Sequence, residues 1–465
     1  MTSSDLERDL GLYSAVTLSM GAMIGGGIFV LPAIAYKKAG PAVVAAYLLA
    51  GLLVLPNALS KAEMATAMPE DGGTYLYIDR AMGPLFGTIA GIGVWFSLVF
   101  KSAFALVGLG AYLLLLVSIP AGVVKLLALG LGALVVLLNI VGTEQSGTVQ
   151  GVLVGLVVVV LGGYVLGGMP AIGATQFSPF LTHGTVGVIT ATAFVFVSYA
   201  GIGEVASVAE EITEPGRTIP QAMLLSIGAM MLIYTAVVGV VVGVVDSETL
   251  VHGGPGGGSS LTPMADAAGT VFGGIGITVV SVTAVLALTS MANAGVLGTS
   301  RFLLAMSRDS LLPEPLGEIN SRFLTPVRSV LVTGAVLLAL IAFVPVVELA
   351  KLASAFLILV FSLENLSVIV FRESDVEFYT PEFTSPGYPV VQLVGVAGGI
   401  VLITQLGMVS ILGAMGIITA SALWYLLYGR SRTDRTGALV TLLRQRGESD
   451  QSTEDVPVTS TQEQD

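Results

Sequence analysis

The sequence predicts an all-α integral membrane protein with about twelve transmembrane helices. Of its 465 residues, 54% are hydrophobic and only 11% are charged, whereas soluble domains carry roughly 25% charged residues. The mean hydropathy is +0.91. Apolar stretches of about twenty residues, enough to cross a bilayer as a helix, recur along the chain.

The apolar stretches also give the predicted domain organisation. Residues 1–13 form a cytoplasmic N-terminus, residues 14–429 the transmembrane domain, and residues 430–465 an acidic tail expected to be disordered. Several stretches have a proline near their first residue, which favours helix initiation there. The twelve stretches are residues 14–36, 41–62, 84–117, 121–141, 149–168, 186–208, 220–245, 268–305, 327–345, 348–371, 388–410 and 412–429.

Three consecutive glycines, Gly25 to Gly27, predict a break in the first helix. Each glycine in a helix interior costs about 1 kcal/mol relative to alanine. The N–H and C=O groups that a break exposes cannot be satisfied by lipid, so they must line a buried or water-filled cavity. The first stretch therefore predicts a ligand site near the middle of the membrane.

A second glycine cluster, between Ser198 and Gly203, lies in the sixth stretch. Five stretches per repeat would place the second repeat in the membrane in the opposite direction. The two repeats are residues 14–168 and 186–371, and residues 388–429 follow them. Inverted repeats with broken helices are typical of alternating-access carriers.

The distribution of Lys and Arg predicts the orientation. If the N-terminus is cytoplasmic, fourteen of the nineteen basic residues lie on the cytoplasmic side and four outside, while Lys101 lies within the third stretch. We therefore expect a multi-pass protein of the cell membrane with both termini inside. The net charge of −12 argues against nucleic acid as a partner.

Composition also argues against an enzyme. The chain has no cysteine and only two histidines, so thiol catalysis and Cys or His metal sites are excluded. No phosphate-binding loop is present, and no His, Asp and Ser residues converge within the stretches. We expect no cofactor beyond a coupling ion.

Four segments together resemble the amino acid–polyamine–organocation permease superfamily. They are residues 25–32, 62–77, 209–220 and 300–313, and the likeness extends over about residues 11–430. The resemblance implies a twelve-helix fold of five-plus-five inverted repeats, like that of the sodium-coupled leucine carriers. It also implies secondary active transport of amino acids.

The resemblance further implies a site for a zwitterion. The substrate carboxylate would bind at Gly26 and Gly27, next to Gly25, where freed N–H groups meet the positive end of a helix. The ammonium would bind unwound carbonyl groups in the two broken helices. The positions that match are Ile24, Val197, Ser198, Ala200 and Gly201.

Two departures from the family pattern favour neutral over cationic substrates. Many members carry a carboxylate at the position of Gly203, but here the acidic residue is the next one, Glu204. Members selective for arginine carry a tryptophan where this chain has Val197. The remaining apolar lining suits small or branched neutral amino acids.

For energy coupling we expect sodium rather than protons. Some proton-coupled relatives carry a lysine at the position of Val157 that takes the place of a sodium ion. The oxygen atoms matching a sodium site are the carbonyls of Gly21, Ile24 and Leu286 and the hydroxyls of Thr289 and Ser290, although the two hydroxyls could equally serve helix packing. Lys101 could instead carry a proton, or pair with Glu204.

Other interpretations stay open. A non-transporting amino acid sensor with the same fold is the alternative function. Charged residues at the predicted cytoplasmic ends form either a solvated boundary or an inner gate of ion pairs. These residues are Glu63, Asp79, Arg80, Glu210, Glu211, Arg217, Arg301, Arg308 and Asp309.

Overall fold

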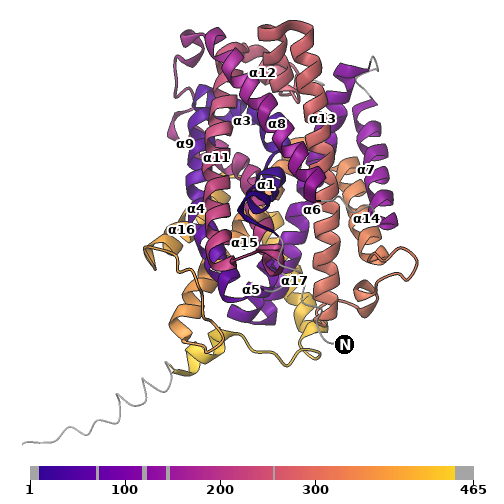
Figure 1. The fold of residues 1–465 in the computed structure, drawn as a ribbon, viewed down its shortest axis with the longest axis vertical. Coiled ribbons are helices and arrows are strands. Elements are labelled where there is room, and N and C mark those ends of the chain that lie inside the picture. The colour runs from indigo at the N-terminus through magenta and orange to yellow at the C-terminus, as the bar shows by residue number, and fades with distance from the viewer. Residues whose placement is uncertain (1–9, 70–72, 118–122, 143–146, 255–256, 446–465) are drawn as a thin grey trace, which may run out of the picture.

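The computed structural model describes residues 10–69, 73–117, 123–142, 147–254 and 257–445, and the regular secondary structure in this part of the chain is helical (Figure 1). Nine of its helical segments are long and apolar enough to cross a membrane. Three more apolar helices are shorter: Leu12–Met23, Val327–Phe343 and Val390–Gln405. The all-α membrane fold is confirmed, while the number of twelve crossings stays a prediction.

Each of the twelve apolar stretches coincides with a helix or with a broken helical segment. One helix, α13, contains a non-helical residue, Gly273, with a φ of 64° that favours glycine. The elements used below are α1 (Leu12–Met23), α2 (Gly26–Phe29), α3 (Leu31–Ala39), α4 (Val43–Ala67), α5 (Gly73–Met82), α6 (Pro84–Leu116), α7 (Val124–Val141), α8 (Gly147–Gly168), α9 (Gly184–Val195), η5 (Phe196–Gly203), α10 (Glu204–Ser207), α11 (Pro215–Val244), α12 (Ser247–His252), α13 (Pro263–Arg308), α14 (Val327–Phe343), α15 (Val346–Ser374), α16 (Val390–Gln405) and α17 (Met408–Trp424).

The two predicted breaks are confirmed, and they differ in kind. In the first stretch α1 ends at Met23, Ile24 is extended with φ −71° and ψ 115°, and α2 begins at Gly26. In the sixth stretch the chain keeps helical turns but tightens into a 3₁₀ helix, η5, for eight residues. The tighter turns change which backbone groups are paired without exposing a fully extended segment.

The broken segments occupy the centre of the molecule. Helix α1 packs against α11, η5 and α8, and α4 packs against η5 and α11. In Figure 1, α1 lies in the middle of the bundle, α7 and α14 at one edge, and α9 and α16 at the opposite edge. Long apolar side chains cover the outside, as on α8, where Val152, Leu156, Val159 and Leu166 are all exposed. That stripe is the surface expected to face lipid.

The two ends of the described chain lie at the same end of the bundle. Leu10 pairs with the segment near Ile212 by backbone hydrogen bonds of 3.0 Å. Residues 430–445, which we call the C-terminal segment, pack near α5 (Figure 1), and Ala438 within it is buried. The predicted tail is therefore partly packed against the bundle, and residues 446–465 lie outside the described residues.

Candidate functional site

The glycine segment presents two free N–H donors at the centre of the bundle. Gly25, Gly26 and Gly27 are all buried. The N–H of Gly26 donates to the sulfur of Met291 at 3.2 Å. Among the described residues, no hydrogen bond involves the N–H groups of Gly25 or Gly27. Such groups at the start of a short helix suit a carboxylate.

Ser198 of η5 faces this segment. Its side chain is 1% exposed, and its hydroxyl oxygen has no hydrogen-bond partner in the described part of the chain. A Cβ atom placed on Gly27 would lie 2.5 Å from that oxygen. The structure therefore brings the predicted residues Gly27 and Ser198 together, with a hydroxyl next to a free N–H.

Gly201 allows the two broken segments to approach each other closely. A Cβ atom on Gly201 would overlap the backbone of Ala22 and Met23 at the end of α1. Val197 and Ala200 lie on the same 3₁₀ helix and are also buried. Every residue predicted for the substrate site therefore lies at this junction.

Three tyrosine hydroxyls, which the sequence analysis did not single out, donate to carbonyl groups at the junction. Tyr47 donates to Gly27 at 2.6 Å, and Tyr112 donates to Phe29 at 2.7 Å. Tyr234 donates to Met23 at 2.6 Å and to Ser198 at 3.1 Å, so it joins both broken segments. Tyrosines in the middle of apolar stretches were the available signal in the sequence, because a buried hydroxyl needs a partner.

The Ile24 carbonyl has no described partner and stays available to an ammonium.

Met291 and Phe104 cover the glycines on the other side. A Cβ atom on Gly26 would lie 2.7 Å from the Phe104 ring, and one on Gly25 would overlap the Met291 sulfur. The Met291 sulfur therefore accepts a hydrogen bond from the Gly26 N–H group, which a substrate carboxylate would need. Its side chain is unbranched and flexible, so it can move aside at low cost.

A large cavity leads from one end of the molecule toward this junction. Its volume is about 1180 Å³, and it extends from α5 and residues 434–436 to Ser97, Ala200 and Gly203. We call it the vestibule. Charged residues of both signs line it, among them Lys61, Asp79, Arg80, Glu204, Glu211, Arg301, Arg308, Asp309 and Arg435.

The residues predicted for sodium divide into two groups. Gly21, Ile24 and Ser290 line one small cavity of about 10 Å³ together with Val157 and Ala287. The carbonyls of Gly21 and Ile24 accept no described hydrogen bond. The volume is near the lower limit for one water molecule.

The other two predicted residues do not line this cavity. Leu286 and Thr289 are exposed, and the Thr289 hydroxyl donates to the Val285 carbonyl of its own helix at 2.7 Å. The Ser290 hydroxyl instead donates to the side-chain oxygen of Gln150 at 3.1 Å. Gln150, which was not among the predicted residues, therefore brings a side-chain oxygen from α8 to Ser290.

Lys101 is buried and donates to the carbonyl of Ala22 at 2.9 Å. No ion pair joins it to Glu204 among the described residues. Its ammonium therefore caps the end of α1, one residue before the break. Glu204 lines the vestibule instead.

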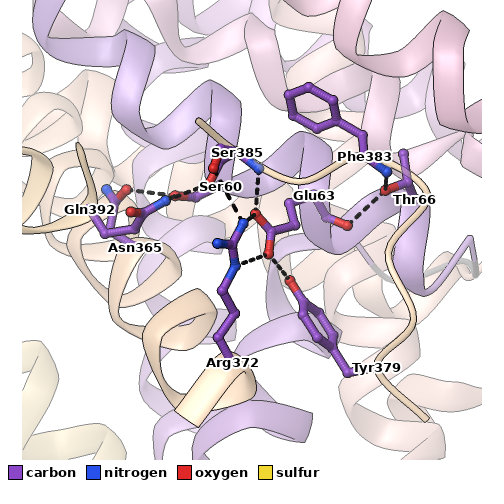
Figure 2. Close-up of polar contacts among 9 residues, drawn as sticks. All are labelled: Ser60, Glu63, Thr66, Asn365, Arg372, Tyr379, Phe383, Ser385 and Gln392. Carbon is purple, nitrogen blue, oxygen red and sulfur yellow. Dashed lines mark hydrogen bonds and ion pairs between the residues drawn. The ribbon is translucent and has the colours of Figure 1, made fainter. Parts of the chain in front are cut away.

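Glu63, one of the candidate gate residues, forms a buried hydrogen-bond network that joins distant parts of the chain (Figure 2). Its carboxylate is completely buried and accepts hydrogen bonds from the Arg372 guanidinium at 2.7 and 2.6 Å. It also accepts from the Tyr379 hydroxyl at 2.9 Å and the Ser385 N–H at 2.7 Å. Glu63 thus ties α4 to α15 and to the loop that follows α15, and all its strong acceptor positions are occupied.

Asp79 lies at the mouth of the vestibule, where Arg435 of the C-terminal segment bridges two acids. Arg435 is 3.5 Å from Asp79 and 3.3 Å from Asp309. Tyr75 donates to Asp309 at 2.7 Å. Burial raises the pKa of Asp79 to about 6, and the nearby Arg435 opposes that rise.

Comparison with known proteins decides the family. A model of the amino acid permease family matches residues 10–430. The chain belongs to the amino acid permease family. The permease is 29% identical to the branched-chain amino acid permease BcaP of Bacillus subtilis over 92% of this chain and 94% of that one.

Two further relatives show the range of the family. BcaP of Lactococcus lactis is 30% identical over 83% of this chain and 86% of that protein. The chloroplastic cationic amino acid transporter 9 of Arabidopsis thaliana is 30% identical over 69% of this chain and 58% of that protein. The permease is thus a multi-pass membrane transporter, and the resemblance found in the sequence is confirmed.

Proposed function

We propose that the permease carries neutral amino acids across the cell membrane by alternating access, coupled to sodium. The observation that carries the proposal is the junction of the two broken helices. There Gly27, whose N–H group is free, lies beside the unpartnered hydroxyl of Ser198, and the free N–H group of Gly25 belongs to the same break. Together they form a donor set for one carboxylate.

The substrate ammonium would bind the Ile24 carbonyl and the backbone near Ala200. A zwitterion needs no charged side chain at this junction, and Gly203 brings no carboxylate there. Two relatives are named for branched-chain amino acids, which supports a neutral substrate. The relative named for cationic amino acids makes charge selectivity the point to test.

The one-sided vestibule supports alternating access. The vestibule opens where α5 and the C-terminal segment lie, and the positive-inside rule assigns that end to the cytoplasm. The structure then represents an inward-facing conformation. Substrate binding would move Met291 and Phe104 away from the glycines.

Sodium would bind in the small cavity beside the break. The carbonyls of Gly21 and Ile24, the hydroxyl of Ser290 and the side-chain oxygen of Gln150 are oxygen ligands of the kind a hard cation prefers. Sodium held there would fix the end of α1, next to the carboxylate donors. Binding of the ion and of the substrate would thereby be coupled.

Counterflow in proteoliposomes tests this function. Vesicles loaded with unlabelled leucine should accumulate labelled leucine, and a thermal-shift panel of amino acids should show stabilisation by neutral ones. Binding without flux would support the sensor function instead. An absence of both binding and flux for all neutral amino acids would overturn the proposal.

A further inference from the structure

The side chain of Lys61 lines the vestibule and is held there in the way that a site holds an ammonium ligand. Its Nζ atom lies 2.9 Å from a carboxylate oxygen of Glu364 on α15 and donates to the Thr74 hydroxyl of α5 at 2.8 Å. The ring of Phe361 lies 5.2 Å from the same atom. A carboxylate, a hydroxyl and an aromatic ring are the groups that recognise a primary ammonium.

Lys61 separates Glu364 from the vestibule. Lys61, Thr74 and Phe361 all line the cavity, whereas Glu364 does not and is completely buried. The second oxygen of Glu364 accepts a hydrogen bond from Asn57 at 2.5 Å. Removal of the Lys61 side chain would therefore open this carboxylate to the cavity.

The ammonium also lies close to the substrate junction. A Cβ atom on Gly203 would lie 2.6 Å from Nζ of Lys61. Gly203 follows Ala200 on the same 3₁₀ helix, and both line the vestibule. Nζ thus occupies space that a side chain at position 203, or the end of a long substrate side chain, would otherwise fill.

Stability alone is a weak reason for such a pair. Burying two charges costs several kcal/mol per ion, and apolar replacements of a buried pair are often neutral or stabilising. We propose that Lys61 occupies a primary-ammonium site formed by Glu364, Thr74 and Phe361, and that this occupancy keeps cationic amino acids out. The link to substrate selectivity rests on the proposed transport function, while the site itself does not.

Chemical rescue tests the site. Lys61→Ala removes the atoms of a propylammonium ion, so propylammonium chloride should raise the melting temperature of this variant above the value in equal sodium chloride. Wild type, in which Lys61 fills the site, and the double variant K61A/E364Q, which lacks the carboxylate, should not respond. Lys351→Ala is the matched control, because it breaks a lysine–glutamate pair, with Glu348, that is partly exposed and outside the vestibule.

Selectivity is tested by competition. In K61A, lysine should inhibit leucine uptake about tenfold more strongly than in wild type, as expected for one gained charge-assisted hydrogen bond. K351A should leave the inhibition unchanged. An absence of propylammonium stabilisation in folded K61A, or an equal response in K61A/E364Q, would overturn the site.

Three further outcomes are also decisive. If K61A is recovered as monodisperse protein only with propylammonium present, the site is supported; if the amine does not restore recovery, the site is rejected. Propylammonium rescue without any amino acid binding by wild type would instead refute the transport function and leave the ammonium site standing.

Discussion

Ser198 faces Gly27 so closely that a methyl group on Gly27 would lie 2.5 Å from the Ser198 hydroxyl oxygen. The two residues come from different broken helices, and the hydroxyl has no described partner. A buried polar group without a partner costs about 1–3 kcal/mol. A bound carboxylate would remove that cost, which is why we propose this pair as the centre of the substrate site.

Filling the glycine positions should abolish substrate binding. In Gly26→Val and Gly27→Val the new side chain would meet Phe104 or Ser198 and take the space of the carboxylate. Thermal shift with leucine should show no stabilisation in either variant, although each stays monodisperse. Gly162→Val is the control, because a Cβ atom there meets nothing within 4 Å; wild-type affinity in G27V would place the site elsewhere.

Removing the Tyr234 hydroxyl should weaken both the fold and binding. Tyr234→Phe leaves the carbonyls of Met23 and Ser198 without this donor, and we expect a loss of about 1–3 kcal/mol in unfolding free energy. Thermal melts and leucine affinity would report it. Tyr164→Phe is the matched control, because the Tyr164 hydroxyl is buried without a described partner, so equal losses in the two variants would contradict the assignment.

The proposed sodium site predicts opposite results for neighbouring residues on α13. Ser290→Ala should reduce uptake driven by a sodium gradient, because Ser290 lines the small cavity. Thr289→Val should leave that uptake unchanged, because Thr289 is exposed and bonded to its own helix. Uptake driven only by a pH gradient, and abolished by Lys101→Met, would reject sodium and assign the coupling to Lys101.

Acid should loosen the C-terminal segment. Burial raises the pKa of Asp79 from 3.8 to about 6. The charged side chain therefore costs stability above pH 6, and the side chain becomes neutral as the pH falls through about 6. Its attraction to Arg435 disappears in the same range. Because the chain lacks cysteine, a spin label at Thr436→Cys can be attached specifically, and its mobility should rise near pH 6. Asp79→Asn should give the mobile spectrum already at neutral pH; an unchanged spectrum would show that Arg435 is held by Asp309.

Neutralising Glu63 should destabilise the fold severely. Glu63→Gln removes the charge that pairs with Arg372 and accepts from Tyr379. Breaking a buried pair costs about 3–5 kcal/mol, which should appear as poor recovery or a large fall in melting temperature. Glu318→Gln breaks the exposed pair with Arg328 and should change stability by less than about 1 kcal/mol.

Much of the site could be predicted from the sequence because the signals are local. Glycine weakens a helix wherever it occurs, so Gly25 to Gly27 indicated a break without knowledge of the neighbours. Likewise, Ser198 and Gly201 could be matched by their place in the sixth stretch. The direction of a side chain on a long helix was harder to assign, as the exposed Thr289 demonstrates, because a register error of one residue rotates a side chain by about 100°.

The membrane class, the helical stretches, the two breaks and the family could all be predicted from the residues alone. These depend on hydropathy and backbone propensity, which each segment carries on its own. The pairing of groups that lie far apart in the chain required the folded structure. That structure paired Lys61 with Glu364, enclosed Glu63 among four donors and placed Tyr234 between the broken segments. The physical reason is that a charge or hydroxyl inside an apolar bundle must find a partner, but the packing of distant helices decides which partner it finds.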